Sequence, residues 1–283
     1  MRYSFFELIG RGLKLFFKSF KILLRVPKIL IFPLISTLFM IFILFLFKTF
    51  VLSFTGSTRY VISYLFYLLS SFVIIFFNSA FVYCVYTYLL SGRASLLEGI
   101  SVAISRLEKI TIWSFLTSTL MLVFNLIENQ LSKRGYGFLG TVLGFAGRTT
   151  FSLISFFVIP IMVIENRGPF ESLKLSGKIL KEDFGETLTG KIALSFAKKF
   201  LLIFTTFLLM TLLFYLNIKN LENGFHIPIM LIVLFALVIA VILILFNAVD
   251  SSLATVIYLY FYREMEENGI NVEYVNLIKE DFL

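Results

Sequence analysis

Long apolar stretches separated by short polar and charged segments make up most of the chain. About 20 helical residues cross the ~30 Å hydrocarbon core of a bilayer. The stretches are continuous, whereas membrane barrels show alternating strands of about ten residues, so the pattern predicts helices. Six membrane segments are predicted: Ile29–Phe47, Tyr60–Leu90, Ile110–Ile127, Gly135–Ile164, Phe200–Leu216 and Ile227–Tyr262.

Two of these segments contain charged residues. The fourth segment includes Arg148 and Pro160, and the sixth continues past Asp250. Charge and proline both disfavour an uninterrupted membrane helix. We therefore expect an all-α integral membrane bundle of about six segments, with one or two broken or half-inserted helices around Arg148 and Asp250.

The first 28 residues predict an interfacial amphipathic helix. Basic residues recur at alternating steps of four and three and thus share one face, while phenylalanine and leucine crowd the rest. This face senses lipid or deforms the membrane in one interpretation, and it is a topology anchor lying flat in the other. The candidate contacts to anionic headgroups are Arg11, Lys14, Lys18, Lys21 and Arg25.

The pattern divides the chain into three parts: residues 1–28, a membrane domain over 29–262, and an acidic tail over 263–283. Within the membrane domain, a further polar helix is expected to begin at Pro169, with Gly185 as its stop signal. The tail either docks on the basic faces or serves as a solubilising end.

Composition excludes a soluble protein and a disordered one. Hydrophobic residues make up 59% of the chain and charged residues 15%, which is more apolar surface than one soluble core can bury. The formal net charge of +8 indicates topology and attraction to anionic lipid headgroups rather than nucleic acid.

The basic residues also predict an orientation. With the N-terminus in the cytoplasm, 19 of the 25 Lys and Arg residues lie inside, five lie outside, and Arg148 lies within the membrane. This distribution predicts cytoplasmic N- and C-termini. No cleavable signal peptide is visible before the first segment, so we expect a multi-pass protein of the cell (inner) membrane.

Arg148 and Asp250 are the candidate substrate-binding residues, because charges inside a bilayer are costly. Arg148 follows glycines at positions 137, 140, 144 and 147, a stripe that allows a second helix to approach closely. Three interpretations of Arg148 stay open: an anion contact, a structural pair with Asp250, and an interfacial residue. Two interpretations of Asp250, which is near Asn247, also stay open. It is part of a proton or cation path, or it marks the inner end of its membrane segment.

Catalytic chemistry finds little support in the sequence. His226 is the single histidine and Cys84 the single cysteine, so neither has a second ligand for a metal site. No phosphate-binding glycine loop is present. We expect no enzyme activity, no catalytic residue, no metal and no cofactor.

The middle of the chain resembles a known membrane family. The residues that carry the resemblance are Trp113-Ser-Phe-Leu, Phe156-Phe-Val-Ile-Pro160-Ile-Met-Val-Ile-Glu165, Gly168-Pro169-Phe-Glu-Ser-Leu-Lys174-Leu-Ser176 and Phe184-Gly185-Glu186. They are similar to the family catalogued as domain of unknown function 6159, and the likeness extends over nearly the whole chain. The resemblance implies a polytopic protein without an established activity or site. A weaker likeness, through Pro27 and Pro33, is to sulfate-permease-like channels.

Two functions follow as expectations. The first is a permease- or channel-like protein for a small anion, with Arg148 as the charged contact. The alternative is a non-transporting protein that shapes membrane or scaffolds partners through its basic amphipathic helix and anionic headgroups.

Overall fold

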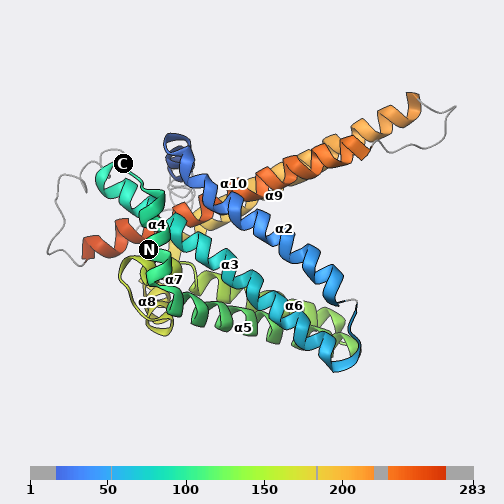
Figure 1. Ribbon diagram of the computed structural model, residues 1–283, viewed down its shortest axis with the longest axis horizontal. Helices are drawn as coiled ribbons and strands as arrows, with labels where there is room; N and C mark the ends of the chain where they lie inside the picture. The colour runs from blue at the N-terminus through green and yellow to red at the C-terminus, as the bar shows by residue number, and fades with distance from the viewer. Residues whose placement is uncertain (1–16, 52, 183, 220–228, 266–283) are drawn as a thin grey trace.

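The apolar segments form long helices that run back and forth as antiparallel hairpins (Figure 1). The computed structural model describes residues 17–51, 53–182, 184–219 and 229–265. Two hairpins are α2–α3 and α5–α6, and α9 pairs with α10. Their bounds are Ile31–Val51 for α2, Gly56–Ser91 for α3, Leu107–Lys133 for α5, Gly137–Ile154 for α6, Phe184–Lys219 for α9 and Ile229–Met265 for α10.

The shorter elements gather at one end of the bundle, which we call the basal end (Figure 1). They are helical residues 17–25, the 3-10 helix η1 (Pro27–Leu30), α4 (Leu96–Ser105), α7 (Val158–Ile164) and α8 (Pro169–Glu182). The turns of the α2–α3 and α5–α6 hairpins lie at the opposite end, the hairpin end. The described chain therefore begins and ends at the basal end, and the α9–α10 pair projects away from it.

The helices confirm the predicted all-α membrane bundle. Five described stretches are long and apolar enough to cross a membrane: Pro27–Val51, Thr58–Ser91, Leu107–Lys133, Gly137–Ile164 and Val233–Leu259. The remaining predicted segment, Phe200–Leu216, lies inside α9. Phe200 and Phe204 of that helix are exposed, as expected for side chains that face lipid.

Helix α3 is central to the bundle, because it contacts α2, α4, α5, α7 and α10. Its basal half is buried through Ala80, Phe81, Cys84 and Val85. Gly99 of α4 packs so closely that a Cβ atom there would lie 2.8 Å from the Ala80 carbonyl oxygen. Helix α4 is thereby held against α3 at the basal end.

Hydroxyl groups connect α3 and α5 inside the bundle. The Tyr64 hydroxyl lies 2.8 Å from Thr119 Oγ1, and Ser71 Oγ lies 3.2 Å from Thr117 Oγ1. Such bonds satisfy polar groups that the hydrocarbon cannot solvate, and each contributes about 0.6 kcal/mol on average between membrane helices.

The interruption of the fourth segment differs from the expectation. Helix α6 continues through Arg148, and the chain breaks later, between Ile154 and Val158. Ser176 of α8 holds this break, because its hydroxyl donates to the Ile154 carbonyl and accepts from the Phe157 N–H. Pro160 lies in the first turn of α7, where its missing N–H leaves no helical bond unmade.

Helix α10 passes through Asp250 without a break, so the expected interruption there is wrong. The predicted start at Pro169 is confirmed, but α8 ends at Glu182 and Gly185 lies inside α9. Helix α4 was not predicted. A capping signal marks its start, because the Ser95 side chain accepts from the Glu98 N–H at 3.4 Å.

The glycine stripe of α6 packs against α5, as its spacing predicts. A Cβ atom at Gly140 would lie 2.8 Å from the Glu128 carbonyl oxygen, and one at Gly147 would lie 2.6 Å from the Phe124 ring. Only hydrogen fits at these positions. The small residues therefore set the distance between the two helices.

We expect Gly140→Ala to lower the free energy of unfolding by about 1–3 kcal/mol, because the added methyl group meets backbone and forces α5 and α6 apart. Gly137→Ala is the matched control, since its Cβ would lie 3.8 Å from the nearest atom, Ser132 Oγ. Thermal unfolding of the purified protein in detergent measures both. Equal melting temperatures for the two variants would contradict the close approach.

Candidate functional site

The basic N-terminal residues lie beside the bundle rather than apart from it. Arg11 and Lys14 fall outside the described residues. In helical residues 17–25, Lys18 is half-buried and Lys21 and Arg25 are exposed. The opposite face buries Ile22 and Leu23 in the protein core. This segment therefore presents lysine and arginine outward while its apolar face packs on the bundle.

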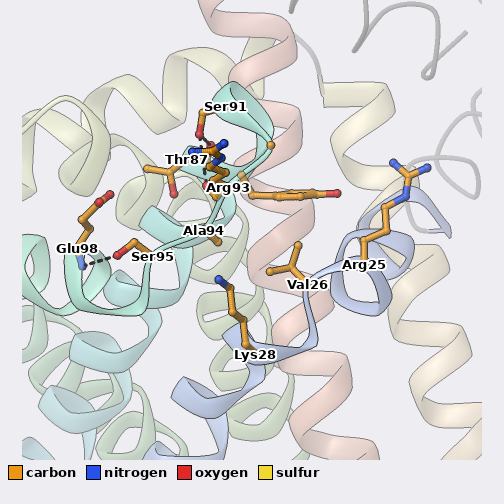
Figure 2. A pocket seen from close by; sticks show the side chains of 11 residues that line it. Arg25, Val26, Lys28, Thr87, Ser91, Arg93, Ala94, Ser95 and Glu98 are labelled. Atoms are coloured by element: carbon orange, nitrogen blue, oxygen red, sulfur yellow. Dashed lines mark hydrogen bonds between the residues drawn. The ribbon is translucent and has the colours of Figure 1, made fainter.

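A cleft of about 830 Å³ opens at the basal end, between the N-terminal segment and the α3–α4 turn. Among the described residues, three cationic side chains and one carboxylate line it. Figure 2 shows Lys28 pointing toward the turn, with Arg25 on one rim and Glu98 on the far side of Ser95. The charged lining residues are Arg25, Lys28, Arg93 and Glu98.

Local backbone geometry places the turn's arginine at this cleft. Gly92 adopts φ 69° at the end of α3, and its N–H bonds to the Tyr88 carbonyl at 2.9 Å. A left-handed residue of this kind ends a helix and turns the chain, and glycine takes the conformation without strain. Arg93 follows directly, and Thr87 and Ser91 add hydroxyl groups to the same wall.

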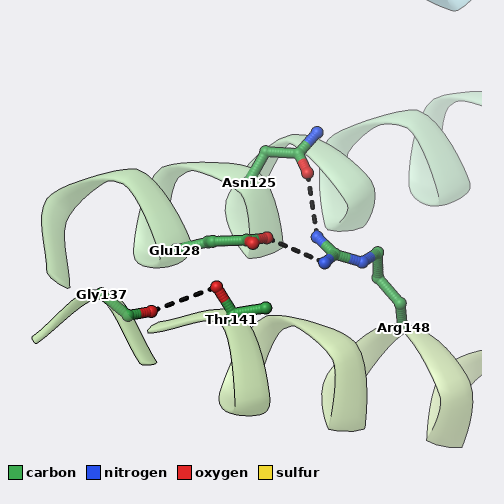
Figure 3. A network of polar contacts seen from close by, with 5 residues as sticks. All are labelled: Asn125, Glu128, Gly137, Thr141 and Arg148. Carbon is green, nitrogen blue, oxygen red and sulfur yellow. Dashed lines mark hydrogen bonds and ion pairs between the residues drawn. The ribbon is translucent and has the colours of Figure 1, made fainter. Parts of the chain in front are cut away.

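Arg148 lies at the interface between α5 and α6 (Figure 3). Its Nη2 is 2.8 Å from Glu128 Oε2, and its Nη1 donates to Asn125 Oδ1 at 3.0 Å. The side chains of the ion pair are 32% and 26% exposed. Because helical side chains lean toward the helix N-terminus, the guanidinium of α6 points toward the hairpin end, where Glu128 lies.

Of the three interpretations of Arg148, the structural pair with Asp250 is wrong, since the carboxylate that pairs with Arg148 is that of Glu128. Glu128 lies one residue beyond the third predicted segment, Ile110–Ile127. Helix α5 in fact continues to Lys133. An acidic residue just past a membrane segment, opposite a glycine-lined helix, is the signal that could have identified it.

Asp250 lines a separate cavity of about 380 Å³ between α2, α3 and α10. Asn247, which the sequence had grouped with it, lines the same cavity, and so does Asn78 of α3. From α9, Lys198 Nζ donates to Asn247 Oδ1 at 3.3 Å. The two candidate substrate contacts thus belong to different sites. Among the described residues, no group of three or more His, Cys, Asp or Glu side chains is placed to hold a metal ion.

The Glu165–Gly168 segment, which was prominent in the family resemblance, connects two basal elements. Asn166 has φ 58°, and its carbonyl and side-chain oxygens both accept from Lys109 Nζ of α5. Arg167 pairs with Glu165. These contacts join the start of α5 to the turn between α7 and α8, which is a structural role.

Helical hairpins with lipid-facing apolar surfaces and few polar groups define a polytopic α-helical membrane protein. The chain belongs to the family of unknown function DUF6159, whose sequence pattern matches residues 57–270. The match begins in α3, so it is narrower than the nearly whole-chain resemblance, and α2 lies outside it. No curated protein matches the chain. The likeness to sulfate-permease-like channels stays a prediction.

We expect Glu128→Ala to lower the free energy of unfolding by about 1–3 kcal/mol, because it leaves the Arg148 guanidinium without its carboxylate. Breaking a fully buried pair costs more, ~3–5 kcal/mol. Thermal unfolding in detergent measures the change. Glu108→Ala, in the exposed first turn of the same helix, is the control. A double variant with Arg148→Ala should lose less than the sum of the single changes; additive losses would contradict the pairing.

Proposed function

We propose that this protein binds anionic phospholipid headgroups at its basal end and shapes membrane or scaffolds partners there, without passing a solute. The observation that carries the proposal is the basal cleft, which brings Arg25 and Lys28 of the N-terminal segment together with Arg93 of the α3–α4 turn. Guanidinium and ammonium groups are the usual partners of phosphate oxygens. Among the described lining residues, three cations outnumber the single carboxylate, Glu98, which gives the cleft a positive balance.

The position of the cleft supports a lipid ligand. Lys28 lies at the start of the spanning stretch Pro27–Val51, and Ser91 ends the stretch Thr58–Ser91. Both ends of a membrane helix lie near the phosphate layer of the bilayer. Cations placed there are worth about 1 kcal/mol each next to an anionic leaflet.

The same surface continues onto the N-terminal segment. Lys21 and Arg25 are exposed one helical turn apart, and Lys28 follows inside the cleft. The predicted headgroup contacts Arg11 and Lys14 precede the described residues and extend the basic spacing. A basic segment of this kind attracts anionic lipid in the leaflet that it faces, which is the cytoplasmic leaflet in the predicted orientation.

A small-anion permease is the other function that the sequence suggested. It relied on Arg148 as a charged contact. Because that guanidinium pairs with Glu128 and Asn125, an anion would have to displace a carboxylate to reach it. Asp250 carries the same sign of charge as an anion. These contacts favour the lipid-binding proposal, which predicts no sulfate or chloride flux into proteoliposomes above that of protein-free vesicles.

We expect Lys28→Ala/Arg93→Ala to weaken binding of phosphatidylglycerol by roughly 10–30-fold, the effect of losing about 1 kcal/mol for each of two cations. Native mass spectrometry of the purified protein, titrated with phosphatidylglycerol and phosphatidylcholine, measures the affinities. The wild type should prefer phosphatidylglycerol, and added salt should reduce that preference.

The matched control is Lys133→Ala/Arg134→Ala, which removes two cations at the hairpin end. It should leave the preference for phosphatidylglycerol unchanged. Equal effects of the two double variants would mean that net charge, rather than the cleft, attracts the lipid. Anion flux that disappears in Arg148→Ala would instead establish the permease.

A further inference from the structure

Three cationic side chains reach the basal cleft from different sides. Figure 2 shows Arg93 coming from the α3–α4 turn, Lys28 pointing toward that turn, and Arg25 on the rim. All three residues are exposed, and within the described part of the chain none of their side chains forms an ion pair or a hydrogen bond. Guanidinium and ammonium groups carry donors and no acceptor. The cleft therefore offers a ligand donors that the protein itself leaves unused.

The hydroxyl groups of threonine and serine in the same wall add little to these donors. Thr87 Oγ1 donates to the Tyr83 carbonyl at 3.1 Å, and Ser91 Oγ donates to the Thr87 carbonyl at 2.8 Å. Because these hydrogens are used within α3, the donors that remain for a ligand come from the cationic groups and the Tyr88 phenol. A ligand that suits this lining is rich in acceptors and brings no amine of its own.

The charge of the cleft matches a dianion. Among the described lining residues, three cations and the single carboxylate of Glu98 leave a formal charge of +2. Figure 2 shows Glu98 on the far side of Ser95 from Lys28. A phosphate that is esterified once carries a charge of about −1.5 to −2 at pH 7 and has three unesterified oxygens. A phosphodiester, as in phosphatidylglycerol, carries one charge and has two such oxygens.

Exposed apolar side chains beside the cleft favour a lipid over a soluble phosphate. Leu24 precedes the lining residue Arg25 and is 67% exposed, and Leu97 precedes the lining residue Glu98 and is 81% exposed. The cleft also adjoins the start of the spanning stretch Pro27–Val51. Acyl chains can cover apolar surface of this kind while a phosphate occupies the cleft.

We propose that the basal cleft selects a lipid with a phosphomonoester headgroup, such as phosphatidic acid, over phosphodiester lipids. This selection rests on the proposed function, which requires only an anionic headgroup. Cations that converge from three sides can each meet one of the three unesterified oxygens, and they favour the doubly charged form of the phosphate. A diester has one oxygen and one charge fewer to offer them.

Binding of dioleoyl phosphatidic acid and dioleoyl phosphatidylglycerol tests the selection, measured by native mass spectrometry of the full chain in detergent. At about pH 8 the wild type should bind phosphatidic acid about fivefold to thirtyfold more tightly, the effect of one further ligand charge beside a net charge of +2. Toward about pH 5.5 this advantage should shrink, because the monoester takes up a proton. The diester keeps its single charge and reports any change in the protein. Equal affinities at about pH 8, or an advantage that does not shrink, would overturn the assignment.

Arg93→Gln and Arg134→Gln form a matched pair of variants. Each replaces an exposed arginine by a neutral side chain, one at the cleft and one at the hairpin end. Because Coulomb energy is proportional to the charge of the ligand, Arg93→Gln should weaken binding of phosphatidic acid by roughly the square of its factor for phosphatidylglycerol. Arg134→Gln should change neither affinity. Equal factors for the two lipids in Arg93→Gln would contradict recognition of a dianion.

Glycerol 3-phosphate distinguishes a lipid from a soluble phosphomonoester, since it carries the same phosphate without acyl chains. It should not displace phosphatidic acid at equal concentration, and displacement would overturn the assignment of a lipid. The proposed function fails in a different way. Phosphatidylglycerol binding that Lys28→Ala/Arg93→Ala leaves unchanged would contradict headgroup binding at the cleft, whereas cleft-dependent binding without a preference for phosphatidic acid contradicts only the selection of a phosphomonoester.

Discussion

Hydrocarbon offers no hydrogen-bonding partner to a peptide group or a charged side chain, and the arrangement of this bundle follows from that constraint. Serine and threonine hydroxyls within the helices bond back to carbonyls of the preceding turn, as Ser114 does to Ile110 at 2.6 Å and Ser118 to Ser114 at 2.6 Å. Other hydroxyls connect α3 to α5. Arg148 is tolerated between α5 and α6 because Glu128 and Asn125 satisfy its guanidinium.

The same constraint distributes charge between the two ends of the molecule. The short basal elements α4, α7 and α8 pack around the ends of the membrane helices. Asn166, between α7 and α8, accepts from Lys109 of α5, and Ser176 of α8 bonds to the break between α6 and α7. The basal cleft lies among these elements, where cations can meet phosphate instead of hydrocarbon. Inside the bundle, Arg148 pairs with Glu128, and Asn78, Asn247 and Asp250 line one cavity.

Apolar runs predicted the membrane fold well, because segment length and continuity reflect the bilayer directly. The glycine stripe also predicted the close α5–α6 packing, since only small residues allow it. The partner of Arg148 was not predictable in the same way: Glu128 and Asp250 are both acidic, and only the register of the hairpin distinguishes them. The break at 155–157 depends on Ser176, a residue 19 positions from Phe157. The apolar pattern does not predict helix α4, because the helix is short, although Ser95 and Glu98 signal its start.

The lipid-binding proposal requires the basal end to lie at the cytoplasmic headgroup layer. Substituted-cysteine labelling in intact cells tests it most directly, because Cys84 is the single cysteine and Cys84→Ser provides a clean background. Arg93→Cys at the basal cleft and Arg134→Cys at the hairpin end are both exposed positions. We expect a membrane-impermeant maleimide to label position 134 in intact cells and position 93 only after permeabilisation. Labelling of position 93 from outside, with position 134 protected, would contradict it.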